Sequence, residues 1–186
     1  MKISKKQFIA LAAILLLTLA FLAVPAAAAD SDYDVYLRLD GIQGDSITKG
    51  YEKWIPITGI QFDATNERGT LTSSAASAGK ASLDSFTIQK NVDSASVPLF
   101  LNLMTGKVIA KGQIVFTTKS KDTSVQQPLI IDLENVIVTD YSFSDGYEGI
   151  TLKATGLKLT YTPQTNSGAK GTPITGGWDF LKNAPK

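Results

Sequence analysis

The stretch Ser82–Lys111 constrains the fold of this 186-residue chain more than any other, because it contains the single convincing helix after the first thirty residues. Its first part, Leu83–Gln89, places Phe86 and Ile88 on one face, which predicts a half-buried strand. A short helix and another strand follow. A chain that otherwise consists of strands usually sets its one helix across a sheet or over an open barrel end.

The helix is predicted over Val97–Thr105. Ser96 is a candidate N-cap, because its hydroxyl can accept a hydrogen bond from a free N–H of the first turn. Gly106 is a candidate C-cap, since glycine adopts the left-handed conformation at little cost. Leu99 and Leu103 are four residues apart and therefore lie on one side of the helix. We expect these two leucines to form the face that packs on the core.

Other segments alternate apolar and polar residues with the period of a strand. These segments are Val35–Leu39, Trp54–Phe62, Gln113–Thr118, Pro128–Tyr141 and Ile150–Tyr161. The alternation slips by one residue near Gly59 and at Thr155-Gly156, which predicts β-bulges. Bulged, bent strands allow a sheet to close on itself. We predict a mainly β fold, a single antiparallel β-barrel domain with bulged strands and one short flanking α-helix.

Residues 1–29 have the pattern of a secretory signal peptide. Three lysines lie near the start, an apolar run follows from Phe8 to Val24, and Ala27 and Ala29 form a small-x-small cleavage motif before Asp30. Cleavage would leave a single domain over 30–186, exported to the periplasm or the extracellular medium. An uncleaved membrane anchor is the alternative, although a run of 17 residues is short for spanning a bilayer.

The chain contains no histidine and no cysteine. Their absence excludes disulfides, Ser-His-Asp and Cys-His catalysis and every histidine-based zinc site. Without the three lysines of the signal, 15 basic and 17 acidic residues remain, which indicates neither a nucleic acid nor an anionic membrane as a partner. We predict no enzymatic activity, no cofactor and no bound metal. A weak calcium site at Asp30, Asp32 and Asp34 and a carboxylate pair for glycoside hydrolysis remain as less favoured alternatives.

The segment Asn66–Lys80 differs from the rest, because its residues are small and polar and Leu71 is its one large apolar side chain. This composition predicts a long exposed loop or a loose hairpin extension. A long loop in a compact domain is uncommon unless it is functional or disordered. Both interpretations stay open on composition alone.

Many motifs along the chain, in their order and spacing, resemble the Hcp family of type VI secretion tube subunits. They are YLRLDGIQGDS (36–46), W-x-P-I (54–57), GKASLDSFTIQKNVDSAS (79–96), LMTGK (103–107), PLIIDLENVIVTDYS (128–142), LKLTYTPQ (157–164) and GGWDFLKN (176–183). The resemblance covers nearly all of the chain after the signal peptide. Two features depart from the family pattern: the signal peptide itself, and the reduction of an aromatic run to Gly-Ile-Gln-Phe at 59–62.

The resemblance implies a β-barrel with one flanking helix and a structural rather than catalytic role. It implies homo-hexameric rings that stack into a tube and carry small effector proteins in the lumen. It also places the segment 66–80 where the family has an extended hairpin that reaches the next ring. The residues expected to take part in ring stacking are Thr70, Leu71, Ser74, Ala76 and Lys80. The alternatives are an exported monomeric binding module or an extracellular fibre subunit that is not used for injection.

Overall fold

The computed structural model describes residues 33–67, 79–118, 127–165 and 169–186, all of which belong to one compact unit. Its strands and helix follow one another as β1 (Tyr33–Leu39), β2 (Ile55–Ile57), β3 (Gly59–Glu67), β4 (Lys80–Asn91), α2 (Ser96–Thr105), β5 (Ile109–Thr118), β6 (Leu129–Ser144), β7 (Tyr147–Lys153), β8 (Gly156–Tyr161), β9 (Ile174–Asp179) and β10 (Ala184–Pro185). All pairs of neighbouring strands in the described residues are antiparallel.

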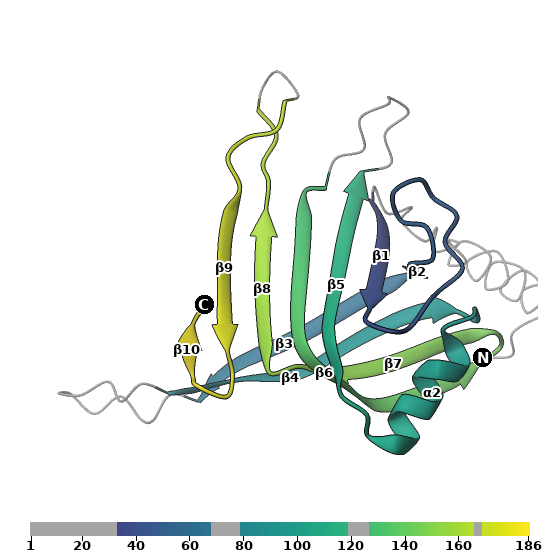
Figure 1. Ribbon diagram of the computed structural model, residues 1–186. Helices are drawn as coiled ribbons and strands as arrows, with labels where there is room; N and C mark the ends of the chain where they lie inside the picture. Colours follow the sequence, from purple (N-terminus) through teal and green to yellow (C-terminus); the bar gives the residue numbers. More distant parts are fainter. Residues whose placement is uncertain (1–32, 68–78, 119–126, 166–168) are drawn as a thin grey trace, which may run out of the picture. The chain divides into compact units, whose positions relative to one another are not determined.

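The strands close into a barrel because the chain passes between its two sheets at two places: along β6, and from β2 into β3 (Figure 1). The long strand β6 pairs with β5 and β8 in its first half and with β7 in its second half. On the opposite side, Thr58 joins β2 to β3, and its N–H donates to the carbonyl of Gln89 at 2.7 Å. Pairing therefore runs from β6 through β5 and β1 to β2, and from β3 through β4 and β7 back to β6. This arrangement confirms the predicted fold class.

The inward faces of these strands fill the barrel with aliphatic side chains and one phenylalanine. Leu37, Ile55, Phe86, Ile88, Ile114, Val136, Ile150 and Leu152 are completely buried there. Burial of this kind supplies the main stabilisation of a chain that has no disulfides. Beyond β6, the strands β8, β9 and β10 extend one sheet past the closed ring.

The helix α2 covers β6 at one end of the barrel (Figure 1). It ends as predicted, because Gly106 adopts the left-handed conformation and its N–H donates to the carbonyl of Leu103. The predicted N-cap was wrong. The cap position belongs to Ala95, and Ser96 is the first helical residue. The Ser96 hydroxyl instead accepts a hydrogen bond from the N–H of Asp93, which lies before the helix.

The two predicted bulges were also misplaced. At Thr155 the chain leaves β7 and begins β8, and at Thr58, beside Gly59, it leaves β2 and begins β3, so both sites are passages between sheets. A slip in alternation has the same appearance in the sequence whether a residue bulges or the chain changes sheet. The register irregularities lie elsewhere, at Asp63/Ala64 in β3 and between Val138 and Asp140 in β6.

Candidate assembly site

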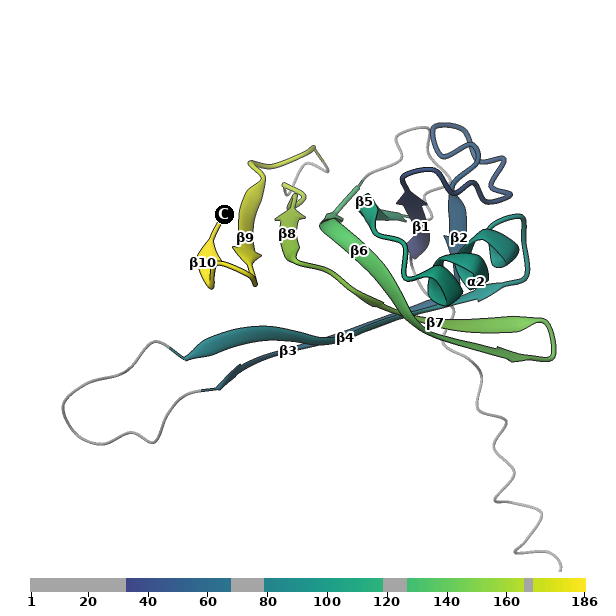
Figure 2. The same cartoon turned by 60° about the horizontal axis from the view of Figure 1, so that its bottom comes forward.

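The β3–β4 hairpin runs past the strands that flank it, as Figure 2 shows. Every β3 residue from Gln61 to Glu67 is exposed. β4 pairs with β7 over Phe86–Asn91 only, so its first six residues, Lys80–Ser85, have β3 on one edge and no strand of the described part on the other. The hairpin therefore exposes β3 beyond Ile60 and leaves the outer edges of both strands without a partner strand in the described part, whereas Leu83 of β4 is buried against the core.

Of the residues predicted to take part in stacking, Thr70, Leu71, Ser74 and Ala76 lie outside the described residues. Lys80 is described; it is exposed, begins β4 and pairs with Glu67 of β3. The strands thus reach into both ends of the segment 66–80, for which the sequence predicted a long exposed loop or a loose hairpin extension. At its described ends the segment fits the hairpin extension, because β3 runs to Glu67 and β4 begins at Lys80.

Cross-strand contacts hold the hairpin together. The rings of Phe62 and Phe86 stack with centroids 5.5 Å apart, and only Phe86 is completely buried. Farther out the contacts are polar: the hydroxyls of Thr65 and Ser82 lie 2.9 Å apart. Aromatic and hydroxyl pairs of this kind add modest stability to a two-stranded ribbon. The hairpin is therefore anchored by its base in the core and becomes polar toward its outer end.

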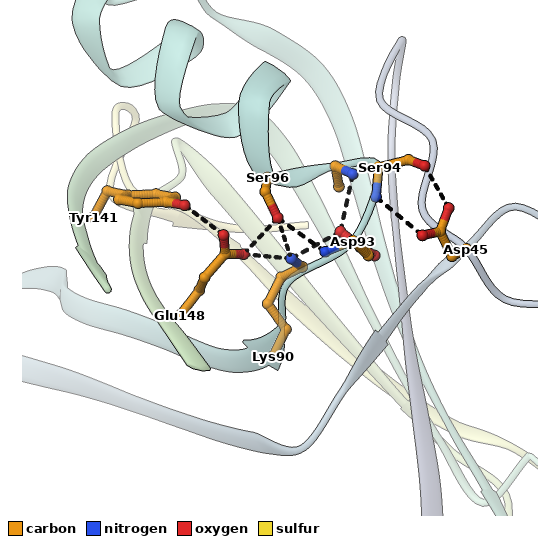
Figure 3. A network of polar contacts seen from close by, with 8 residues as sticks. Asp45, Lys90, Asp93, Ser94, Ser96, Tyr141 and Glu148 are labelled. Atoms are coloured by element: carbon orange, nitrogen blue, oxygen red, sulfur yellow. Dashed lines mark hydrogen bonds and ion pairs between the residues drawn. The ribbon is translucent and has the colours of Figure 1, made fainter. Parts of the chain in front are cut away.

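At the other end of β4, a buried polar network joins that strand to α2 and to the β6–β7 hairpin (Figure 3). The ammonium of Lys90 forms ion pairs with Glu148 and, at 2.8 Å, with Asp93. It also donates to the Ser96 hydroxyl at 3.1 Å, which in turn donates to Glu148 at 3.0 Å. Tyr141 donates to the second carboxylate oxygen of Glu148. Lys90 has no exposed surface, so its charge is stable only because these partners surround it.

The network shifts the pKa values of Glu148 and Tyr141. Burial raises the pKa of Glu148, but hydrogen bonds from Lys90, Tyr141 and Ser96 outweigh burial, so that the pKa lies below its ordinary value. Burial, together with the hydrogen bond to Glu148 and its negative charge, raises the pKa of Tyr141 to about 12. Glu148 is therefore ionised and Tyr141 protonated at neutral pH.

Asp93 of the network lies against Gly44 in the loop between β1 and β2. A Cβ atom on Gly44 would lie 2.9 Å from Oδ2 of Asp93 and 2.6 Å from the carbonyl oxygen of Trp54, so only glycine fits there. Next to it, Asp45 accepts hydrogen bonds from the N–H and the hydroxyl of Ser94 (Figure 3). These contacts fix the position at which the chain enters α2, which is a structural role.

The outward face of β1, β5, β6 and β8 carries a row of polar side chains in register: Arg38, Gln113, Asp132 and Lys158. Gln113 donates to Asp132 at 2.7 Å, and Lys158 lies 3.8 Å from the same carboxylate. This row lines a shallow groove of about 310 Å³. Both signs of charge alternate across it, so the groove favours neither anions nor cations.

The two helix residues predicted to face the core differ in burial. Leu99 is completely buried, and Leu103 is partly buried and packs against the same core. Phe100 is half exposed and contacts the Tyr141 ring edge to face at 5.8 Å. On the outer side, Leu101 and Met104 are exposed.

The signal-cleavage residues Ala27, Ala29 and Asp30 lie outside the described residues. Within the described ranges, no cluster of three or more carboxylate, histidine or cysteine side chains is arranged to hold a metal ion. The same ranges contain no helix with the length and apolar character needed to cross a bilayer.

Sequence reasoning missed the residues that form the buried network. Lys90 and Asp93 carry a local signal, since charged residues three apart flank the entry to a helix. Nothing local indicates that Glu148, which is 58 residues away, meets them. Asn183 was also missed; its side chain bonds to the backbone of Gly79 and Ala81 at the outer end of β4.

Comparison with known proteins supports the fold and the family. The family model for the type VI secretion system effector Hcp matches residues 36–161. No curated protein matches the chain by sequence. Among solved structures, that of a type six secretion system protein is 26% identical with a TM-score of 0.74, and the match covers 83% of this chain and 99% of that chain.

Two further structures show the same fold. Hcp1 from Salmonella typhimurium is 23% identical with a TM-score of 0.67, and the match covers 84% of this chain and 100% of that chain. A type VI secretion system effector from Yersinia pestis is 23% identical with a TM-score of 0.60, over 78% of this chain and 99% of that chain. Because the family match spans more than half of the sequence, this chain belongs to the Hcp family of type VI secretion system effectors.

Proposed function

We propose that the chain is a structural, self-assembling subunit that forms hexameric rings, that the rings stack into tubes, and that the lumen carries small effector proteins. Membership of the Hcp family supports the class of function. The observation that carries the assembly proposal is the β3–β4 hairpin, which extends past its neighbouring strands with β3 exposed from Gln61 onward. No catalytic step or cofactor is part of the proposed role.

A free strand edge is a template for contact with another chain. In β3, the backbone groups that point away from β4 have no partner strand in the described part of the structure. Natural proteins usually protect a long exposed edge, so an unprotected one fits a protein that meets further copies of itself. The contact is expected to be modest in strength, because ordering a polar segment on binding costs conformational entropy.

The oligomeric mass of the chain 30–186 tests the ring. Light scattering coupled to size exclusion should give six times the protomer mass. A monomeric mass at all concentrations would contradict ring formation and favour the alternative of an exported binding module. Long polymers without a ring species would favour the fibre subunit.

Shortening the hairpin tests its role in stacking. Replacing Thr70–Gly79 with a tight Asn-Gly turn leaves the barrel strands untouched, so the domain and its rings should persist. Tubes should disappear from electron micrographs while rings remain. Tubes that form equally well from the shortened variant would remove the hairpin from the assembly mechanism.

We also propose that the signal peptide 1–29 directs export and is cleaved before Asp30, which places the chain in the periplasm or the extracellular medium. The basic start, the apolar run and the alanine motif support this assignment. N-terminal sequencing of the exported protein should begin at Asp30. A sequence that begins at Met1 would show that the segment is retained.

A further inference from the structure

One side chain from the C-terminal end of the protein is bonded to the outer end of β4, at the start of that strand. Nδ2 of Asn183 donates to the carbonyl oxygen of Gly79 at 3.1 Å, and its Oδ1 accepts from the N–H of Ala81 at 3.0 Å. The carboxamide therefore offers one donor and one acceptor to the backbone on either side of Lys80. It supplies the same pair of bonds that a neighbouring strand would supply.

These bonds lie where β4 lacks a second strand. On one edge, Ala81 pairs with Asn66 of β3. On the other edge, pairing with β7 begins only at Phe86, five residues farther along the chain. An isolated two-stranded ribbon is only marginally stable in water, so a contact at Ala81 helps to hold the outer end of β4 in place.

Asn183 is itself held rigidly. The backbone of Asn183 is left-handed, with φ of 51°, which asparagine tolerates better than most residues. Oδ1 of Asp179 accepts hydrogen bonds from the N–H groups of Leu181 at 3.0 Å and Lys182 at 2.9 Å. The bond from the Lys182 N–H contributes most to holding the pKa of Asp179 below its ordinary value.

The turn that carries Asn183 is also tied to the barrel. The N–H of Phe180 donates to the carbonyl of Thr155 at 2.9 Å, and the Phe180 ring packs against the core. After the turn, Ala184 pairs with Asp179. The side chain of Asn183 thus connects a turn tied to the barrel with the outer end of β4 in the protruding hairpin.

We propose that Asn183 is a positioning residue that sets the direction of the β3–β4 hairpin and so prepares it to contact a second copy of this chain. The role in stacking rests on the function proposed above, whereas the positioning itself does not. The expected partner of the hairpin is another copy of this chain, because the proposed function assigns the exposed edge of β3 to self-assembly.

The test compares substitutions at two asparagines that share a backbone conformation. Asn183→Gly removes the carboxamide and keeps a residue that tolerates the left-handed backbone. Asn183→Asp keeps an acceptor for Ala81 but has no proton to donate to Gly79. The control is Asn135→Gly, since Asn135 is also left-handed, with φ of 47°, and its side chain bonds to Thr155 rather than to the hairpin.

Two measurements report on positioning without requiring assembly. Amide hydrogen exchange reads the N–H of Ala81 directly. Because the chain has no cysteine, Glu67→Cys on β3 and Lys107→Cys after α2 accept spin labels selectively, and both positions are exposed. Diluting labelled chains with unlabelled ones confines the measured electron–electron distances to single subunits.

In Asn183→Gly, exchange at Ala81 should accelerate about tenfold, as expected for the loss of two ordinary hydrogen bonds, and the distance distribution should broaden. Asn183→Asp should lie between wild type and the glycine variant, and Asn135→Gly should match wild type. Equal exchange rates and equal distance distributions in Asn183→Gly and Asn135→Gly would overturn the positioning role.

Electron microscopy then tests the consequence for assembly. Asn183→Gly should reduce tubes while leaving single rings, and Asn135→Gly should leave both. A broadened distance distribution together with an undiminished number of tubes would overturn the link to stacking. If wild type forms no rings at all, the function proposed above fails, but the exchange rates and spin-label distances still decide the role of Asn183.

Discussion

The two halves of strand β4 have opposite surroundings. From Phe86 to Asn91 the strand pairs on both edges, and three of its side chains, Phe86, Ile88 and Lys90, are completely buried. From Lys80 to Ser85 it pairs with β3 alone, apart from the bonds that Asn183 makes to Gly79 and Ala81 at its outer end. One continuous strand therefore passes from the barrel core to an exposed ribbon.

This difference separates stability from assembly within one strand. The inner half excludes water from apolar and charged groups alike, so changes there affect the free energy of unfolding. Apart from Leu83, which is buried in the core, the outer half buries little, so changes at its other positions affect the direction and contacts of the hairpin more than the fold. Substitutions in the two halves of β4 show how sharp this division is.

The largest effect is expected from Lys90→Met at the inner end of β4. The substitution leaves Glu148 and Asp93 buried without their cation, which should lower the free energy of unfolding by about 3–5 kcal/mol. Urea unfolding followed by tryptophan fluorescence measures the loss. The double variant Lys90→Met, Glu148→Leu removes one of the uncompensated charges and should recover part of the stability. A loss below about 1 kcal/mol in the single variant would show that water compensates the network.

A second large effect is expected at the helix that follows this half of β4. Leu99→Ala should lower the free energy of unfolding by about 2–5 kcal/mol, because Leu99 is completely buried and its removal leaves a cavity. Leu103→Ala should cost less, since Leu103 is only partly buried. The two variants are matched in chemistry and lie one helical turn apart. A larger loss for Leu103 than for Leu99 would contradict the observed packing of α2.

A smaller, pH-dependent effect is expected from Glu148. Its pKa is lower in the folded chain than its ordinary value of 4.5, so its ionised form stabilises the fold above that pH. This contribution should disappear as the pH falls from about 4.5 through the lower folded-state pKa. Unfolding midpoints measured between pH 6 and pH 3 should therefore decline less in Glu148→Gln than in wild type. Parallel curves would show that Glu148 does not contribute to acid sensitivity.

The smallest effect is expected from Ser82→Ala in the outer half of β4. The Ser82 hydroxyl bonds to Thr65 and donates to Asp84 in exposed positions, where water replaces lost bonds readily. The free energy of unfolding should change by less than about 0.5 kcal/mol, as is usual for surface substitutions. Measured beside Lys90→Met, this variant tests the division along one strand. A loss above about 1 kcal/mol would mean that the outer hairpin contributes to the stability of the barrel.

The sequence alone determined the elements whose signals are local. Alternation predicted the strands at 35–39, 83–89 and 128–141, and the helix ended at Thr105 with Gly106 as its cap, as the pattern indicated. Alternation predicts strands correctly because the two faces of a strand meet different environments. Gly106 was predicted correctly as the cap because a left-handed backbone favours glycine wherever it occurs. The motifs along the chain also indicated the Hcp family, which the family match shows.

Only the tertiary structure decided how those elements meet. The slip at Thr155-Gly156 became a passage between sheets, and the hydroxyl of Ser96 joined a buried ion pair in place of capping the helix. Lys90 pairs with Glu148, which is 58 residues away in the sequence, and Asn183 bonds to Ala81, which is 102 residues away. A charged or amide side chain has no periodicity that identifies its partner. Its role follows from which backbone or counter-charge the closed barrel places within hydrogen-bond distance, and that placement is set by the packing of the whole domain.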